Sequence, residues 1–129
     1  MKIVYFSLTG NVKRFLTKAN LINQAICVKP DLVMNQGFVL ITPTIGFGEI
    51  PADVVDFLEY HDNYRYLQAT VGSGNKNWGV RYCRAAKTIA DTFKVENIFN
   101  FELAGNQHDV EEFIQILAKL ERDNDEQIH

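Results

Sequence analysis

The sequence predicts an α/β fold: a doubly wound, five-stranded parallel sheet with strand order 2-1-3-4-5 and helices on both faces. Short, continuous apolar runs alternate along the chain with segments whose apolar residues recur at helical spacing. Strands that alternate with helices are joined by right-handed crossovers, which makes the sheet parallel. The chain has 129 residues, enough to bury one core of this kind and too few for a second.

The first half of the chain supplies three strands and two helices. Residues 2–6 form a continuous apolar run, typical of a strand buried on both faces. Apolar residues at i, i+3, i+4 and i+7 from Val12 predict a helix that starts near Asn11. Two more strands are expected at 25–29 and 37–42. Pro51 suits the first turn of a short helix with one apolar face.

The second half continues the alternation. A fourth strand is expected at 67–72, a helix at 80–93, a fifth strand at 98–103 and a last helix at 109–122. The apolar stripe of that last helix consists of Val110, Phe113, Ile114, Leu117 and Leu120. We therefore expect a single domain over residues 1–122, followed by a solvated, frayed tail at 123–129.

Composition excludes several classes of function. The net charge is -3 and the pI about 5.5, and the basic residues are scattered, which argues against a nucleic-acid or membrane partner. With neither a long apolar segment nor a signal sequence, a cytoplasmic address is expected. Cys27 and Cys83 lack metal-ligand spacing, so buried thiols are favoured over a disulfide. The three histidines make no metal site by their spacing.

The most informative feature is a set of three polar, glycine-bearing loops at the carboxyl ends of strands, where this topology places its ligand crevice. In "SLTGN", Ser7 and Thr9 offer hydroxyls, Asn11 an amide, and Gly10 a backbone that can turn inward where a helix dipole begins. Such a loop suits a phosphate group. It lacks the lysine of a P-loop, so it would hold a phosphate rather than transfer one. The alternative is an ordinary helix cap made by Thr9 or Asn11.

The second and third loops suit a flat aromatic ligand. "TPTIGFG" carries two hydroxyls, two glycines and Phe47, although Phe47 could instead pack into the core. "SGNKNWG" places Trp78, the only tryptophan, between Gly74 and Gly79. The alternative for Trp78 is that it covers the edge of the sheet. Together the loops indicate a pocket with a phosphate at one end and a planar ring at the other.

These motifs also carry a family resemblance. The order of elements, "SLTGN", "ITPTIGFGEIP" and especially "SGNKNWG" followed by "FEL" resemble the NrdI family of small flavodoxins, which activate the manganese-dependent class Ib ribonucleotide reductase. The similarity extends from Lys2 to about Leu120. The first loop is shared by flavodoxins generally, whereas the third is specific to this family.

The resemblance implies a flavodoxin-like fold that binds FMN, with the phosphate in the first loop and the isoalloxazine ring between the other two. It implies no metal ligand and no catalytic side chain, because the flavin carries the chemistry. In flavodoxins generally, a glycine peptide beside the ring turns over on reduction, and here that peptide falls at Gly46. The implied cofactor-binding residues are Ser7, Leu8, Thr9, Gly10, Asn11, Val12, Thr42, Pro43, Thr44, Ile45, Gly46, Phe47, Gly48, Ser73, Gly74, Asn75, Trp78 and Gly79.

The resemblance also implies partners. A reductase would supply electrons to the flavin, the reduced flavin would pass them to dioxygen, and the resulting oxidant would reach the dimanganese site of the reductase small subunit. The main alternative is a general electron-carrier flavodoxin, and another is a flavodoxin fold that has lost its cofactor. A receiver domain is disfavoured because Ser7 and Thr42 stand where it needs acidic residues.

Overall fold

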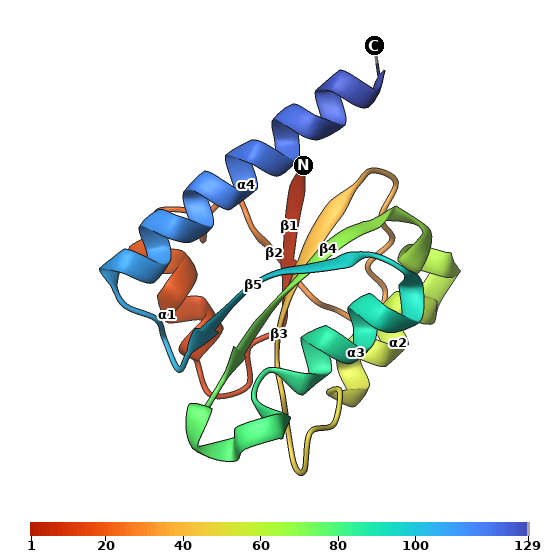
Figure 1. Ribbon diagram of the computed structural model, residues 1–129. Helices are drawn as coiled ribbons and strands as arrows, with labels where there is room; N and C mark the ends of the chain where they lie inside the picture. Colours follow the sequence, from red (N-terminus) through yellow and green to blue (C-terminus); the bar gives the residue numbers. More distant parts are fainter. Residues whose placement is uncertain (129) are drawn as a thin grey trace.

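A computed structural model describes residues 1–128, with the side chains of residues 1–124. Five strands form one sheet: β1 (Lys2–Tyr5), β2 (Ile26–Cys27), β3 (Phe38–Pro43), β4 (Leu67–Gly74) and β5 (Glu96–Glu102). Their order is β2-β1-β3-β4-β5, and every neighbouring pair is parallel. The predicted fold class and strand order are therefore confirmed (Figure 1).

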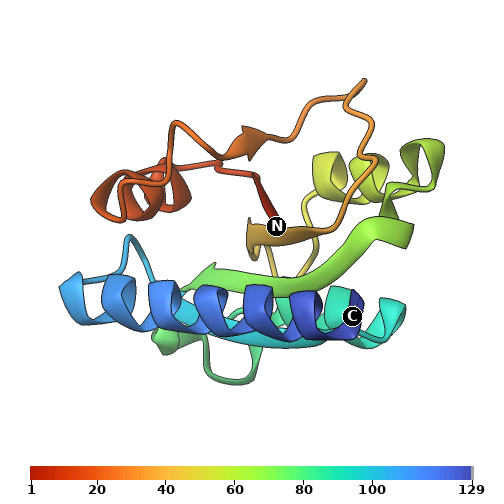
Figure 2. The same ribbon diagram turned by 90° about the horizontal axis from the view of Figure 1, so that it is seen from above.

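Four α-helices cover the sheet: α1 (Asn11–Lys18), α2 (Ala52–Glu59), α3 (Arg84–Phe93) and α4 (Gln107–Ile128), with 3-10 segments η1 (Tyr60–Tyr66) and η2 (Lys76–Arg81). Helices α1 and α4 pack on one face and α2 and α3 on the other (Figure 1). Both views show α4 running alongside β5 (Figures 1 and 2). None of the helices in the described part of the chain combines the length and apolar character that crossing a bilayer requires.

The core explains why the sequences of the strands are continuous apolar runs. Along β3, Val39 and Ile41 pack against α1 and α4, whereas Leu40 packs toward α2 and α3, so successive side chains are buried on opposite faces. On the α1 side, the ring of Phe15 stacks on that of Phe101 with centroids 3.9 Å apart. This stacking, together with the buried Val12 and Leu16, packs α1 against the sheet.

Two helix boundaries differ from the prediction. Helix α3 begins at Arg84 rather than at residue 80, because Cys83 has φ 53 and the preceding segment is the 3-10 turn η2, itself broken at Gly79. Helix α4 continues to Ile128, so residues 123–128, predicted as a tail, are helical. No glycine or proline follows Arg122 to stop the helix. Residue 129 lies outside the described residues.

Two side-chain predictions are also corrected. Ile114 was expected in the apolar stripe of α4, but it is 43% exposed, while Val110 and Phe113 are buried. Both cysteines are free; Cys83 is buried as predicted, and Cys27 is exposed because β2 lies at the edge of the sheet. Burial raises the pKa of the Cys83 thiol to about 11.

Candidate functional site

The three polar loops meet at the carboxyl ends of β1, β3 and β4, where they enclose a pocket of about 210 Å³. This is the crevice that the strand order predicts, since α1 and α2 leave neighbouring strands toward opposite faces. The pocket is lined by Ser7, Leu8, Thr9, Asn11, Val12, Pro43, Thr44, Ile45, Ser73, Gly74, Asn75, Trp78 and Leu103. All of these except Leu103 are among the residues expected from the sequence to bind the cofactor.

The first loop leaves the start of α1 open. Gly10 occupies the N-cap position with φ 88 and has no side chain to cap the helix, and neither Thr9 nor Asn11 accepts an N–H of the first turn, so the alternative of a cap by one of them is wrong. Ser7 Oγ lies 3.5 Å from a backbone N–H of the first turn. The first turn contains no acidic residue, and the N–H groups at a helix start have no partner within the helix. This end of α1 can therefore accept an external anion.

Arg14 lies over the same loop, and the sequence reasoning missed it. Its Nη2 donates to Asn11 Oδ1 at 2.7 Å and to Thr9 O at 3.3 Å. A β-carbon on Gly10 would lie only 2.9 Å from Arg14 Nη1, so the guanidinium rests against the glycine. The available signal was the i, i+3 spacing of Asn11 and Arg14 on one helix.

In the second loop the hydroxyls serve the fold. Thr42 is buried and donates to Pro43 O at 2.9 Å. Thr44 Oγ1 is also buried and accepts the Ala85 N–H at 2.9 Å, which caps the start of α3 from outside the helix. Of the two, only Thr44 lines the pocket.

The tip of the second loop projects from the protein. Ile45 and Glu49 pair through two backbone hydrogen bonds of 3.0 and 2.8 Å. Between them, Gly46 and Gly48 have φ 53 and 106, a region that favours glycine. Phe47 is 77% exposed, so the alternative that it packs in the core is wrong. Gly46, Phe47 and Gly48 do not line the pocket.

The third loop forms the opposite wall of the pocket. Trp78 lies at the pocket and is 41% exposed. Asn75 Oδ1 accepts the Asn77 N–H and caps η2. Gly74 is tightly packed, since a β-carbon there would lie 3.0 Å from Cys83 N. Gly79 has φ 57 with open space around it and lies outside the pocket.

Leu103, at the end of β5, completes the pocket. It has φ 54 and two backbone hydrogen bonds to the third loop: its N–H donates to Gly74 O, and its carbonyl accepts from Ser73 Oγ, both at 2.8 Å. Its position follows from the parallel sheet, whose fifth strand ends at the same edge. An apolar residue alone gave no signal of a site.

Several large apolar side chains on the loops that form the pocket are exposed, and Leu8, Trp78 and Leu103 among them line it. Five large apolar side chains on the loops around the pocket, which we call the rim, are exposed: Leu8, Phe47, Trp78, Val80 and Leu103. The Arg81 guanidinium lies over the Phe47 ring, 5.4 Å from its centroid. Exposed apolar side chains on neighbouring loops are typical of a surface that contacts another molecule.

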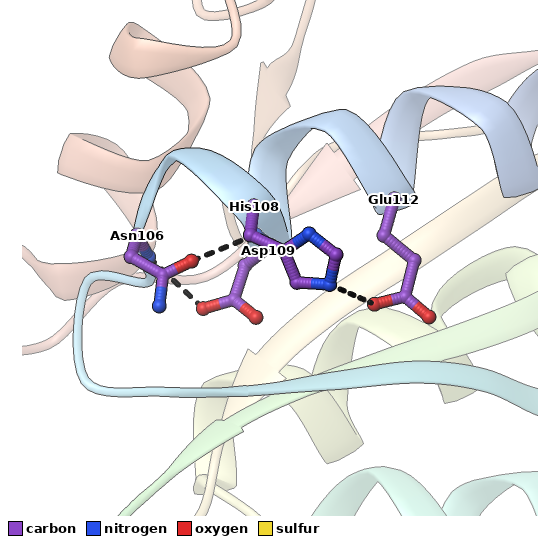
Figure 3. Close-up of polar contacts among 4 residues, drawn as sticks. All are labelled: Asn106, His108, Asp109 and Glu112. Carbon is purple, nitrogen blue, oxygen red and sulfur yellow. Dashed lines mark hydrogen bonds and ion pairs between the residues drawn. The ribbon is translucent and has the colours of Figure 1, made fainter.

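The start of helix α4 is capped by side chains at its own N-terminal end (Figure 3). The Asn106 N–H donates to Asp109 Oδ2 and the Asp109 N–H donates to Asn106 Oδ1, both at 2.9 Å. This reciprocal capping box satisfies the first donors of the helix. On the same helix, His108 Nε2 lies 4.0 Å from Oε2 of Glu112, one turn later. Among the described residues, no three His, Cys, Asp or Glu side chains gather as a metal site would require.

Comparisons with known proteins agree with this architecture. The family model described as "NrdI Flavodoxin like" matches residues 3–115. Among solved structures, the chain is similar to a short-chain flavodoxin associated with a PDU bacterial microcompartment, with a TM-score of 0.66 and 19% sequence identity. That match covers 92% of this chain and 95% of the other. At this identity the likeness supports the fold.

Proposed function

The chain belongs to the NrdI family of flavodoxin-like proteins, whose members bind FMN, and we propose that it activates the small subunit of a class Ib ribonucleotide reductase in the cytoplasm. When bound and reduced, the flavin supplies electrons to dioxygen, and the oxidant formed serves the dimanganese site of that subunit. The protein's own residues hold the cofactor, shield it and present it to partners.

The residues of the pocket fit FMN. The single observation that supports this most strongly is that an open helix start and an aromatic wall share one pocket. We assign the phosphate to the Ser7 and Thr9 hydroxyls and to the N–H groups at the start of α1, because a helix start attracts a dianion. No acidic side chain lines this pocket to repel it.

The isoalloxazine ring belongs to the apolar part of the pocket. Pro43, Ile45 and Trp78 line it from the second and third loops, and we expect them to exclude water from the ring faces. The loop tip at Gly46 does not itself line the pocket, and we propose, from the family resemblance, that its peptide would approach the edge of a bound ring. Thr42 and Thr44 support this arrangement through their internal hydrogen bonds.

The rim supports a protein partner at the mouth of the pocket. Val80 is 92% exposed and Leu103 51% exposed, and such side chains are stabilised when a partner covers them. Docking there would place a partner next to the flavin, as transfer of an oxidant to a small subunit requires. The same surface would receive the reductase that supplies electrons.

The test begins with the visible spectrum of the purified protein during titration with FMN. The reduced FMN protein is then mixed with a class Ib small subunit, manganese and air, and radical formation is followed by electron paramagnetic resonance. We expect radical with this protein and little with an unrelated flavodoxin. Equal yields from both would favour the general electron carrier instead, and failure to bind FMN would contradict both functions.

A further inference from the structure

Arg14 stands out because its charge has no acidic partner among the described residues. It lies in the second turn of α1, where the helix dipole disfavours a cation. Among the described residues it makes no ion pair, and its two hydrogen bonds both use Nη2, to the neutral acceptors Asn11 Oδ1 and Thr9 O. The first turn of the helix holds no carboxylate. The arrangement therefore gathers positive potential around the first loop.

The guanidinium also shapes the loop. By bonding Asn11 and Thr9 together, it bridges the residues on either side of Gly10, which has the left-handed φ of 88. Gly10 leaves the space in which Nη1 rests, since a β-carbon there would come within 2.9 Å of it. Both the glycine and the arginine are thus needed for this loop conformation.

We propose that Arg14 is a positioning residue that makes the first loop selective for a phosphate dianion over an uncharged group. The inference rests on the proposed function, because it concerns the FMN site. Arg14 holds the loop in its binding conformation before the ligand arrives, and the bound dianion balances its charge. While Nη2 donates to both acceptors, Nη1 of the same planar group rests against Gly10, and the single nitrogen of a lysine ammonium cannot occupy both places.

The experiment compares FMN with riboflavin, which lacks the phosphate, by fluorescence titration of wild type, Arg14→Gln and Arg14→Lys. The matched control is Lys13→Gln, which removes the same charge from the neighbouring position. The Lys13 side chain makes no hydrogen bond or ion pair within the described residues. Thermal unfolding of each variant checks that it is folded.

We expect Arg14→Gln to reduce the preference for FMN over riboflavin at least about tenfold, the usual effect of losing charge-assisted bonds and their geometry. Its riboflavin affinity stays within about threefold of wild type, because the ring pocket is intact. The preference of Arg14→Lys for FMN over riboflavin should lie between those of wild type and Arg14→Gln. Lys13→Gln keeps the Arg14 hydrogen bonds to Asn11 and Thr9. Its preference for FMN over riboflavin should therefore fall by less than about threefold, because exposed charges contribute little.

Three outcomes overturn the inference. In the first, Arg14→Gln keeps the wild-type preference for FMN over riboflavin. In the second, its affinities for FMN and riboflavin fall in parallel, which makes Arg14 a structural residue. In the third, Lys13→Gln loses as much of the preference as Arg14→Gln, which makes the effect one of general charge. Failure of the proposed function looks different. In that case the wild-type protein itself binds FMN no better than riboflavin, or binds neither.

Discussion

Helices α1 and α4 both begin at the carboxyl edge of the sheet, but their first turns are built in opposite ways. At α4, Asn106 and Asp109 satisfy each other's backbone donors. At α1, a glycine occupies the N-cap, the only side-chain acceptor for a first-turn N–H among the described residues is Ser7 Oγ at a long 3.5 Å, and Arg14 adds positive charge. A self-capped helix start serves folding, whereas an open, cationic one is suited to an external anion.

Helix α3 is an intermediate case. One of its first donors, the Ala85 N–H, is satisfied by Thr44, a residue of another loop that also lines the pocket. The three helix starts thus differ in the group that supplies the cap. For α4 it is the helix's own side chains, for α3 a neighbouring loop, and for α1, as we propose, the cofactor. Mutations at each should separate stability from FMN affinity.

The largest effect is expected at the open start. Thr9→Ala removes an exposed hydroxyl from the first loop, and we expect FMN affinity to fall ten- to a hundredfold, or about 1.5 to 3 kcal/mol. The unfolding midpoint should be unchanged, because no other described group depends on that hydroxyl. Fluorescence titration measures the affinity, and Thr9→Ser is the control that keeps the hydroxyl. Unaltered affinity in Thr9→Ala would remove Thr9 from the phosphate site.

The start of α3 should show the reverse pattern. Thr44→Val keeps the shape of the side chain but leaves the buried Ala85 N–H without an acceptor. We expect the free energy of unfolding to fall by about 2 kcal/mol in a denaturant titration. The FMN affinity of the folded protein should change little, and Thr44→Ser should recover most of the stability. A large loss of affinity without loss of stability would show that this hydroxyl faces the cofactor.

The self-capped start of α4 should affect stability alone. Asn106→Ala removes the acceptor of the Asp109 N–H, and loss of such a cap costs about 1 kcal/mol of unfolding free energy. Asn106→Ser, which can still cap, is the control. We expect identical FMN affinities for all three proteins, and a weakened affinity in Asn106→Ala would mean that α4 also participates in binding.

The smallest effect on stability is expected when α1 is made to resemble α4. Asn11→Asp places a carboxylate in the first turn of α1, beside Arg14. We expect a gain of about 0.5 kcal/mol in the free energy of unfolding from the helix dipole and the new ion pair. Because the carboxylate repels a phosphate, FMN affinity should fall severalfold while riboflavin affinity is retained. Unchanged binding of FMN would contradict an anion site at this helix start.

The sequence predicted those parts of the fold that are determined by burial. The continuous apolar run of β3 and the helical spacing from Val12 were enough to identify both elements, because their environment is repeated along them. The start of α3 could not be predicted in the same way. Cys83 adopts φ 53 because of its packing against β4, and nothing in its neighbours along the chain indicates a turn.

The site was predictable to the level of its loops, but individual side chains were not. Hydroxyls after strands indicated a polar pocket, yet the partner of Thr44 is 41 residues away along the chain. Leu103 joins the pocket through its backbone, which composition does not reveal. Arg14 was not among the predicted residues, because its contacts across Gly10 depend on the left-handed conformation of that glycine.

Because one cysteine is exposed and the other is buried, the protein has a single accessible thiol for spectroscopic labels among the described residues. At pH 7 to 8, Cys83 remains a buried, protonated thiol, since its pKa is raised to about 11, and maleimides react with thiolates. Cys27 is exposed and pairs in register with Tyr5 on β1, two residues before the first loop begins. A dye or spin label can therefore be attached to the unmodified chain at one position, a single strand away from the residues that we assign to the phosphate.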